Sequence, residues 1–333
     1  MKKFITLFAL SISLFTAKAQ TAEELHSSAR DLMRQGDYGN ATLLLVKALE
    51  QSPNDLEIAK DLSLNYYFDK NNDKALETIK PLLDRTDVDD QVYQVAGTVY
   101  KAMENYKDGE ALYKKGIKRF PKSGPLYNEY GELLMMQQNP ASIVQWERGI
   151  EMDPTYPGNY YNASKYYSFT ADKVWSLLYA EIFVNLEPLS NRTAEIKTLL
   201  LEGYKKLVTD ADQLKNTDQK NKFETAVLQS MSRQVATITG PVTPESLSML
   251  RTRFVLDWFE NNGKNLPFRL FDYQQQLLHE GIFDAYNQWI FGAAQNLVAY
   301  QNWTSAHAVE YIDFSNFQKG RIFKIPAGQY YHK

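Results

Sequence analysis

The sequence repeats a pattern of about 34 residues through its first half. The segment GDYGNATLLLVKALEQSPND, residues 36–55, shows this pattern: a glycine, an aromatic residue, an alanine, an aliphatic run, a second alanine and a proline. Prolines return at Pro53, Pro121, Pro154 and Pro188, with gaps of 68, 33 and 34 residues. A period of this length indicates a fold made of stacked structural repeats, and it constrains the chain more than any other feature of the sequence.

The pattern divides residues 22–190 into five units, namely 22–55, 56–89, 90–123, 124–156 and 157–190. The eighth position of every unit is small: Ala29, Ser63, Gly97, Gly131 and Ser164. With one residue deleted from the fourth unit, the twentieth position is small as well: Ala41, Ala75, Gly109, Ser142 and Ser176. The eleventh position is large in every unit, and the twenty-fourth is bulky in the first four, with Leu45, Ile79, Tyr113 and Trp146.

These columns predict a hairpin of two amphipathic helices in each unit, joined by a short turn such as RQGDY or DKNND. Two helices approach closely only where a side chain is small, so positions eight and twenty let the pair nest, and the bulky positions fill the neighbouring holes. Proline at position thirty-two cannot continue a helix, and it therefore fixes the turn into the next unit.

With these columns and this spacing, residues 22–190 resemble the tetratricopeptide repeat family. The resemblance implies an all-α, right-handed solenoid of about five helical hairpins that binds other proteins. The second unit departs from the family pattern, with Asp87 where proline is expected and Pro81 inside its second helix. The fifth unit departs too, with Ala180 and Phe183 where a large and then a small residue are usual. We expect both repeats to be distorted rather than absent.

The second half of the chain matches no pattern of this kind. A helical pattern over residues 192–208 is expected to cover the exposed face of the last repeat, as a solenoid end requires. From Phe254 to Tyr331, 18 of 78 residues are aromatic. We expect either a helical subdomain packed on the repeats or an aromatic docking face, and composition does not separate the two. The predicted domains are 1–19, a cleaved signal peptide; 20–208, the solenoid with its capping helix; 209–243, a linker and helix; and 244–333, an aromatic-rich helical domain.

The first residues predict export. MKK is a basic start, FITLFALSISLF is an apolar run too short to span a bilayer, and Ala17 and Ala19 precede a cleavage site before Gln20. With residues 1–19 removed, 34 basic residues face 40 acidic ones, so the charge is about −6 and nucleic acid is not an expected partner. With no cysteine there is neither a disulfide framework nor a cysteine-linked lipid anchor. We expect a periplasmic or extracellular protein, bacterial by the shape of its signal, with no transmembrane span and no lipid anchor.

Motifs for catalysis are absent from the sequence. The four histidines lack the spacing of a metal-binding helix, and the sequence contains no phosphate-binding loop, dinucleotide motif or nucleophile elbow. Two carboxylate pairs, Glu280 with Asp284 and Asp257 with Glu260, have the spacing that brings both groups to one side of a helix. A glycosidase could use such a pair, but solvated acidic pairs are far more common. We therefore predict a protein that is not an enzyme, with no catalytic residues, cofactor or metal.

The family resemblance implies a partner-binding groove along the first helices of the repeats. The positions that would line it include His26, Arg30, Lys60, Tyr67, Gln94, Lys101, Asn128, Tyr161 and Lys165, with Glu132 and Met135 beside them. Arg30, Lys60, Lys101 and Lys165 would form a basic ladder suited to an acidic peptide. A solvated face that binds no peptide is the alternative interpretation.

Three hypotheses of function follow. The favoured one is a non-enzymatic scaffold or adaptor in an envelope or export assembly, with a protein or peptide partner. The alternative is a protein whose aromatic second half binds a carbohydrate or another small ligand. The third is a hydrolase that uses one of the carboxylate pairs.

Overall fold

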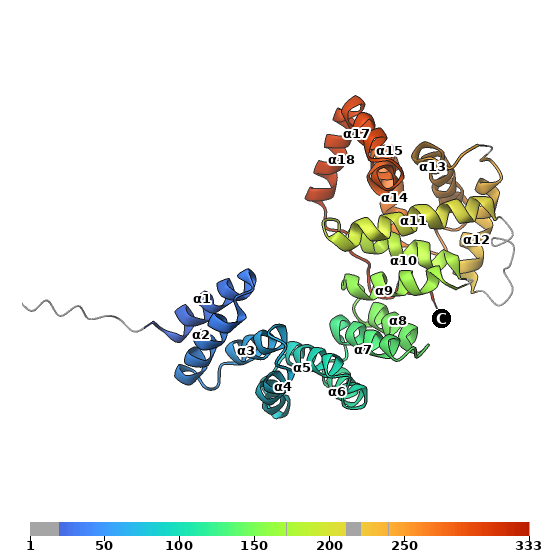
Figure 1. The fold of residues 1–333 in the computed structure, drawn as a ribbon. Coiled ribbons are helices and arrows are strands. Elements are labelled where there is room, and N and C mark those ends of the chain that lie inside the picture. The colour runs from blue at the N-terminus through green and yellow to red at the C-terminus, as the bar shows by residue number, and fades with distance from the viewer. Residues whose placement is uncertain (1–19, 171, 211–220, 239, 333) are drawn as a thin grey trace, which may run out of the picture. The chain divides into compact units, whose positions relative to one another are not determined.

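A computed structural model describes residues 20–170, 172–210, 221–238 and 240–332. Every regular element within these ranges is a helix, so the predicted all-α fold is confirmed (Figure 1). The described chain forms two compact units, one ending at Met103 and the other beginning at Glu104. The predicted signal peptide, residues 1–19, lies outside the described residues.

The first unit consists of helical hairpins. Its elements are α1 (Ala22–Gln35), α2 (Tyr38–Gln51), α3 (Leu56–Phe68), α4 (Asn72–Ile79), the 3₁₀ helix η1 (Lys80–Asp84) and α5 (Asp90–Ala102). Side chains in the turns cap the helices: Thr21 forms a capping box with Glu24, and Asp55 accepts from two backbone N–H groups of α3. Gly36 ends α1 with φ of +79°, a conformation that glycine adopts without strain.

The second unit begins with more hairpins and continues into a larger helical body. Its elements are α6 (Tyr106–Arg119), α7 (Gly124–Met136), α8 (Ser142–Met152), α9 (Pro157–Ser168), α10 (Lys173–Leu186), α11 (Asn191–Thr209), α12 (Lys222–Val235), α13 (Pro244–Asn261), α14 (Arg269–His279), α15 (Phe283–Asn287), the π-helix η3 (Gln288–Gly292), α16 (Ala293–Gln295), α17 (Leu297–Ala306) and α18 (Ala308–Gly320).

The small-residue columns lie at the contacts for which the spacing selects them. All ten residues at positions eight and twenty are buried. In the second repeat the Ser63 hydroxyl donates to the carbonyl of Ala75, 2.8 Å away, and in the fifth the Ser176 hydroxyl donates to the carbonyl of Ser164, 2.9 Å away. Positions eight and twenty therefore meet within one hairpin, as predicted.

The two departures from the family pattern have different outcomes. In the second repeat, α4 ends at Ile79 and the chain continues as a 3₁₀ helix around Pro81, which confirms the expected distortion. In the fifth repeat, α10 runs without interruption, so no break accompanies Ala180 and Phe183. Phe183 packs against the ring of Tyr161, with 5.3 Å between centroids.

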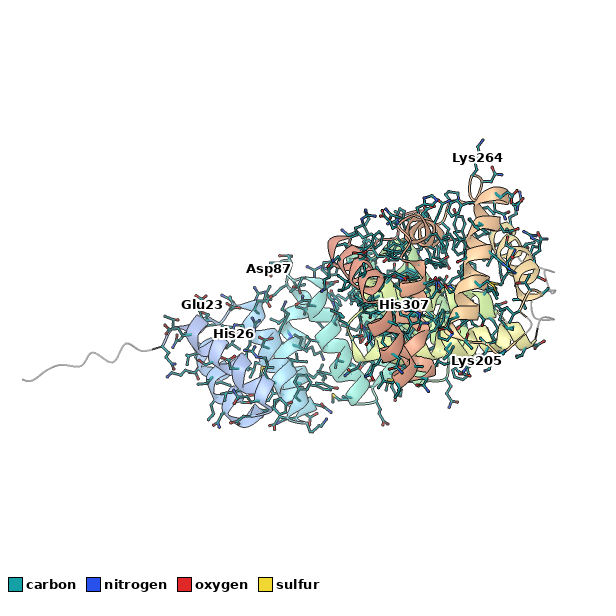
Figure 2. All side chains as sticks on the ribbon, turned by 90° about the horizontal axis from the view of Figure 1, so that it is seen from above. Glu23, His26, Asp87, Lys205, Lys264 and His307 are labelled. Atoms are coloured by element: carbon teal, nitrogen blue, oxygen red, sulfur yellow. The ribbon has the colours of Figure 1, made fainter. Side chains whose placement is uncertain are left out.

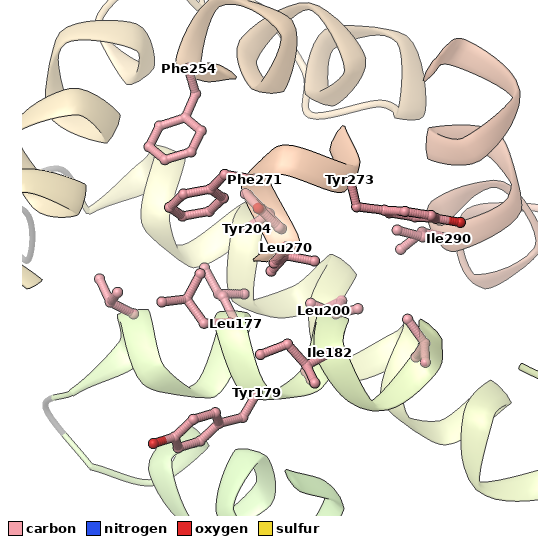
Figure 3. Packing of buried hydrophobic residues seen from close by; sticks show 14 of the residues in the cluster. Leu177, Tyr179, Ile182, Leu200, Tyr204, Phe254, Leu270, Phe271, Tyr273 and Ile290 are labelled. Carbon is pink, nitrogen blue, oxygen red and sulfur yellow. The ribbon is translucent and has the colours of Figure 1, made fainter. Parts of the chain in front are cut away.

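Residues 174–185 of α10 are all buried, because the helix packs between α9 on one side and α11 on the other. The predicted covering helix is therefore present as α11. One hydrophobic cluster extends from Trp146 on α8 to Ile325 near the C-terminus (Figure 3). The last hairpin and the aromatic-rich helices thus share a core, and the predicted boundaries near residues 208 and 243 remain predictions.

The aromatic-rich segment is more divided than its sequence indicates. Helix α13 begins at Pro244 with Thr243 as its N-cap, as predicted, and the break at Gly281 is present with φ of +72°. Where two or three helices were expected in residues 266–303, Asn296 adds a break in extended conformation and η3 inserts a π-helical turn. Local spacing did not signal either one, because each depends on packing against α11 and α13.

A buried polar cluster joins α10 to the C-terminal helices. The Glu181 carboxylate accepts from the guanidinium of Arg251, from the Tyr286 hydroxyl at 2.8 Å and from the Gln274 amide at 2.7 Å. Arg251 also donates to Asn287. These groups come from α10, α13, α14 and α15, so the cluster fixes how four helices meet in the core (Figure 3 shows the apolar residues around it).

Candidate functional site

In the first unit, two of the predicted groove residues converge on one carboxylate. His26 Nε2 lies 2.7 Å and Arg30 Nε lies 2.5 Å from Asp61 Oδ2. His26 and Arg30 belong to α1 and Asp61 to α3, so the first helices of consecutive repeats are tied together at this point; Figure 2 marks His26.

Lys60 is enclosed by acidic groups. Its ammonium lies 2.6 Å from Glu57 and 2.8 Å from Asp89, and it donates to the Gln91 amide oxygen at 3.0 Å. Burial by itself lowers the pKa of Lys60, but the hydrogen bonds and charges of Asp89 and Glu57 outweigh it and the pKa lies above its usual value. With 4% of the residue exposed, this lysine offers little of its charge to a ligand.

The remaining predicted residues of this unit are partly buried. Tyr67, on α3, packs beside Phe68 with 5.3 Å between ring centroids, and the ammonium of Lys70 lies 5.9 Å from the Tyr67 ring. Gln94 and Lys101 lie on α5.

In the second unit, the predicted residues form two contacts between helices. Asn128 is buried on α7 and accepts from the Asn162 amide of α9 at 2.9 Å. On α9, Tyr161 donates to Glu195 at 2.6 Å, and the ammonium of Lys165 lies 2.6 Å from the same carboxylate. Arg30, Lys60 and Lys165 are thus each compensated by an acidic group of the chain, and an acidic peptide would have to displace those partners.

A wide apolar pocket opens beside Lys165. Its volume is about 710 Å³, and we call it the Met–Phe pocket. Its apolar wall consists of Met135, Met136, Trp146, Tyr166 and Phe169, and its polar edge of Glu132, Asn162, Lys165 and Thr170. Met135, Met136 and Phe169 are 42%, 51% and 89% exposed, so large apolar side chains face water around it. Exposed apolar groups gathered at a hollow are typical of a binding surface.

Comparison with known proteins supports the repeat interpretation. The profile of the family described as "Tetratricopeptide repeat" matches residues 32–97. That segment consists of tetratricopeptide repeats. Among curated proteins, none matches this sequence significantly.

Several solved structures of tetratricopeptide repeat proteins are similar at low identity. A thermophilic protein of Thermus thermophilus is 17% identical with a TM-score of 0.46, over 54% of this chain and all of its own. The structure of pilF from Pseudomonas aeruginosa is 14% identical with a TM-score of 0.46, over 63% of this chain and 96% of its own. A tetratricopeptide repeat protein from Parabacteroides merdae is 13% identical with a TM-score of 0.42, over 77% of this chain and 97% of its own.

The tetratricopeptide pattern places the Met–Phe pocket at the ends of two first helices. Met135 and Met136 are the last residues of α7, and Phe169 caps α9. Gly131 allows Trp146 to approach α7 so closely that its indole N–H donates to the carbonyl of Asn128, 3.2 Å away. Of the wall, only Met135 lay in the predicted groove. The signal for the others was two consecutive methionines and an aromatic residue at helix ends, where turn residues are usually polar.

The two carboxylate pairs have different surroundings. The guanidinium of Arg233 holds Asp257 with two hydrogen bonds, of 3.0 and 2.6 Å, and Glu260 is exposed. Asp284 accepts from the Ser248 hydroxyl, whereas Glu280 faces Arg321 at 3.9 Å. Among the described residues, no three or more His, Asp or Glu side chains are arranged to hold a metal ion, and no described helix is long and apolar enough to cross a membrane.

Proposed function

We propose that this chain is an exported adaptor, which binds an apolar segment of a partner protein in the Met–Phe pocket and links it to an assembly of the cell envelope. Tetratricopeptide repeats bind protein partners, and the Met–Phe pocket is the observation that supports this site. Three exposed apolar side chains and a volume of about 710 Å³ suit two or three apolar side chains of a helical or extended peptide. The predicted signal peptide supports the envelope as the location.

The peptide that fits this pocket is apolar rather than acidic. Lys165 at the pocket edge is already paired with Glu195, and Glu132 accepts from the amide of Asn128 at 3.0 Å. Binding through these charges would cost the protein its own ion pair and hydrogen bond. Methionine side chains adapt to different apolar shapes, which favours Leu-, Ile- or Phe-bearing segments in this position.

A site-specific crosslinking experiment tests the proposal. A photoreactive phenylalanine at position 169 should form crosslinks to one reproducible membrane or periplasmic protein, and the purified partner should then bind the wild-type chain directly. Met136→Glu should weaken that binding by about tenfold or more, because a carboxylate would be buried against apolar groups. Leu189→Glu is the matched control, since Leu189 is 94% exposed outside the pocket. Equal binding by the Met136→Glu and Leu189→Glu variants would refute the site.

Export has its own test. The protein purified from cells should begin at Gln20, as intact-mass measurement would show. A chain that retains residues 1–19, found with soluble cytoplasmic markers, would contradict the proposed location while leaving the Met–Phe pocket untouched.

A further inference from the structure

A second pocket lies among the C-terminal helices, away from the repeat columns. Its volume is about 380 Å³, within the roughly 300–1,000 Å³ that small-molecule sites occupy. We call it the C-terminal pocket. Helix α13 contributes Glu245, Met249 and Arg253, α15 contributes Asp284, and α17 and α18 contribute Trp303 and Glu310.

Each of the three carboxylates is oriented by one neutral donor. Glu245 accepts from the Gln288 amide at 2.7 Å, Asp284 accepts from the Ser248 hydroxyl, and Glu310 accepts from the backbone N–H of Ala285 at 2.9 Å. Gln288 and Ser248 are themselves buried, which keeps these carboxylates in place. A neutral donor positions a carboxylate without neutralising it.

The charge of the C-terminal pocket is therefore largely uncompensated. No lysine or arginine of the described chain forms an ion pair with any of the three carboxylates. Arg253 lines the same pocket, so the lining residues carry a formal charge of −2 when His307 is neutral. Burial raises the pKa of Glu310, and the nearby charge of Asp284 adds to this, against the hydrogen bond from Ala285.

An aromatic wall completes the site. Trp303 lines the C-terminal pocket, and the His307 ring stacks on its indole with 4.3 Å between centroids and an interplanar angle of 11° (Figure 2 marks His307). His307 Nδ1 also lies 3.0 Å from the carbonyl of Trp303, which fixes the two rings together. Carboxylates beside an indole and a methionine suit an organic cation, because its charge meets the acids while its carbon chain meets the apolar side chains.

We propose that the C-terminal pocket binds a linear aliphatic polyamine, with its ammonium groups accepted by Glu245, Asp284 and Glu310 and its carbon chain against Trp303 and Met249. Three carboxylates on α13, α15 and α18 match several separated ammonium groups better than a single one. A metal ion fits less well, since no described group of three such side chains has the arrangement to hold one. This site is independent of the Met–Phe pocket and of any protein partner.

Calorimetric titration of the full chain with spermidine at 150 mM NaCl tests the proposal. Spermidine should bind saturably, and triacetylspermidine, which has the same carbon chain without charge, should not. Asp284→Asn and Glu310→Gln keep the acceptors for Ser248 and Ala285 while removing one charge, and each should weaken binding by about tenfold. Trp303→Ala should also weaken it, by loss of the aromatic wall.

Glu260→Gln supplies the control, because Glu260 is an exposed carboxylate on the same helix outside the C-terminal pocket. It should change the affinity by less than about twofold, the size expected for a single exposed charge. Circular-dichroism melts of all variants exclude misfolding as the cause. Absence of saturable heat with spermidine, unchanged affinity in the Asp284→Asn Glu310→Gln double variant, or tighter binding of a lysine-containing peptide than of spermidine would each overturn the proposal.

Discussion

Gly131 lies on α7 where the backbone of the helix faces the indole of Trp146. A Cβ atom at this position would lie 2.3 Å from the indole nitrogen and 2.6 Å from its neighbouring carbon. The Trp146 ring is buried and hydrogen-bonded to Asn128, so it has little room to move. We predict that Gly131→Leu lowers the free energy of unfolding by about 3 kcal/mol or more, the upper range for overpacking, as urea denaturation would measure.

Gly39 offers the matched control for this substitution. It also lies inside a repeat helix, α2, but a Cβ atom there would meet nothing within 4 Å. Gly39→Ala should raise stability by about 0.5–1 kcal/mol, because alanine loses less conformational freedom in a helix. Equal losses in both variants would mean that helix propensity, and not the contact with Trp146, decides the choice of glycine.

Lys197, on α11, holds its ammonium 3.6 Å from the centre of the Trp289 ring. Burial lowers the pKa of Lys197 to about 7. Below pH 7 the folded and unfolded states both carry the proton, and the folded state bears the full cost of burying it. Between pH 7 and about 10.4 only the unfolded state holds the proton, so stability should rise with pH across this window.

Lys197→Met removes this titration while keeping the length of the side chain. At pH 6 we expect the variant to be more stable than the wild type by roughly 1–2 kcal/mol, a part of the cost of burial because the indole face favours the ammonium. The difference should shrink by pH 9 in urea titrations. Parallel stability curves for the two proteins from pH 6 to pH 9 would contradict the lowered pKa.

At the residue scale, the sequence predicted contacts within a hairpin better than contacts between repeats. Ser63 meets Ala75 over a fixed local spacing, which the small-residue columns record. The acids that compensate Lys60 and Lys165 come instead from Asp89 and Glu195, which lie about one repeat further along the chain. Acidic residues are common at all exposed helix positions, so nothing in their spacing marked them as partners of the basic groups.

At the scale of elements, α10 shows where repeat geometry gives way to a different core. Its sequence was compared with second helices that keep one face in water, whereas here both faces are covered. Glu181 lies on this helix with its carboxylate buried against Arg251, and its side chain is 3% exposed. A lone charged residue in a helical pattern predicts a solvated face, and only the arginine that arrives 70 residues later explains its burial.

The Glu181–Arg251 pair gives a test of how α10 is joined to α13. Glu181→Leu or Arg251→Met alone should lower stability by about 3–5 kcal/mol, because each leaves the other charge buried without its partner. The double variant should lose less than the sum of the two, since no buried charge remains. Urea unfolding of all four proteins gives the coupling energy, and strictly additive losses would show that the two charges do not depend on each other.

At the scale of the whole molecule, the repeat period predicted the hairpins but not how they end. A solenoid that ended with a simple polar cap would survive removal of the residues behind it. Here α10 buries twelve consecutive residues, and the chain end returns to the repeats, with His332 Nδ1 lying 2.7 Å from Glu147 on α8. The aromatic density after Phe254 is thus explained in large part by core packing with the last repeat.

A chain that stops after Ser190 should therefore not behave as an independent solenoid. Truncation would expose Leu178 and Ile182 of α10 and leave Glu181 without Arg251, so apolar surface and an unpaired acid would face water together. We predict that residues 20–190 aggregate or melt without a cooperative transition and bind a hydrophobic dye, whereas residues 20–333 melt cooperatively. Circular dichroism with analytical ultracentrifugation measures both properties. A soluble, monomeric 20–190 fragment with a sharp melt would mean that the repeats fold on their own and that the C-terminal helices are an addition, in which case the shared core cannot be what stabilises α10.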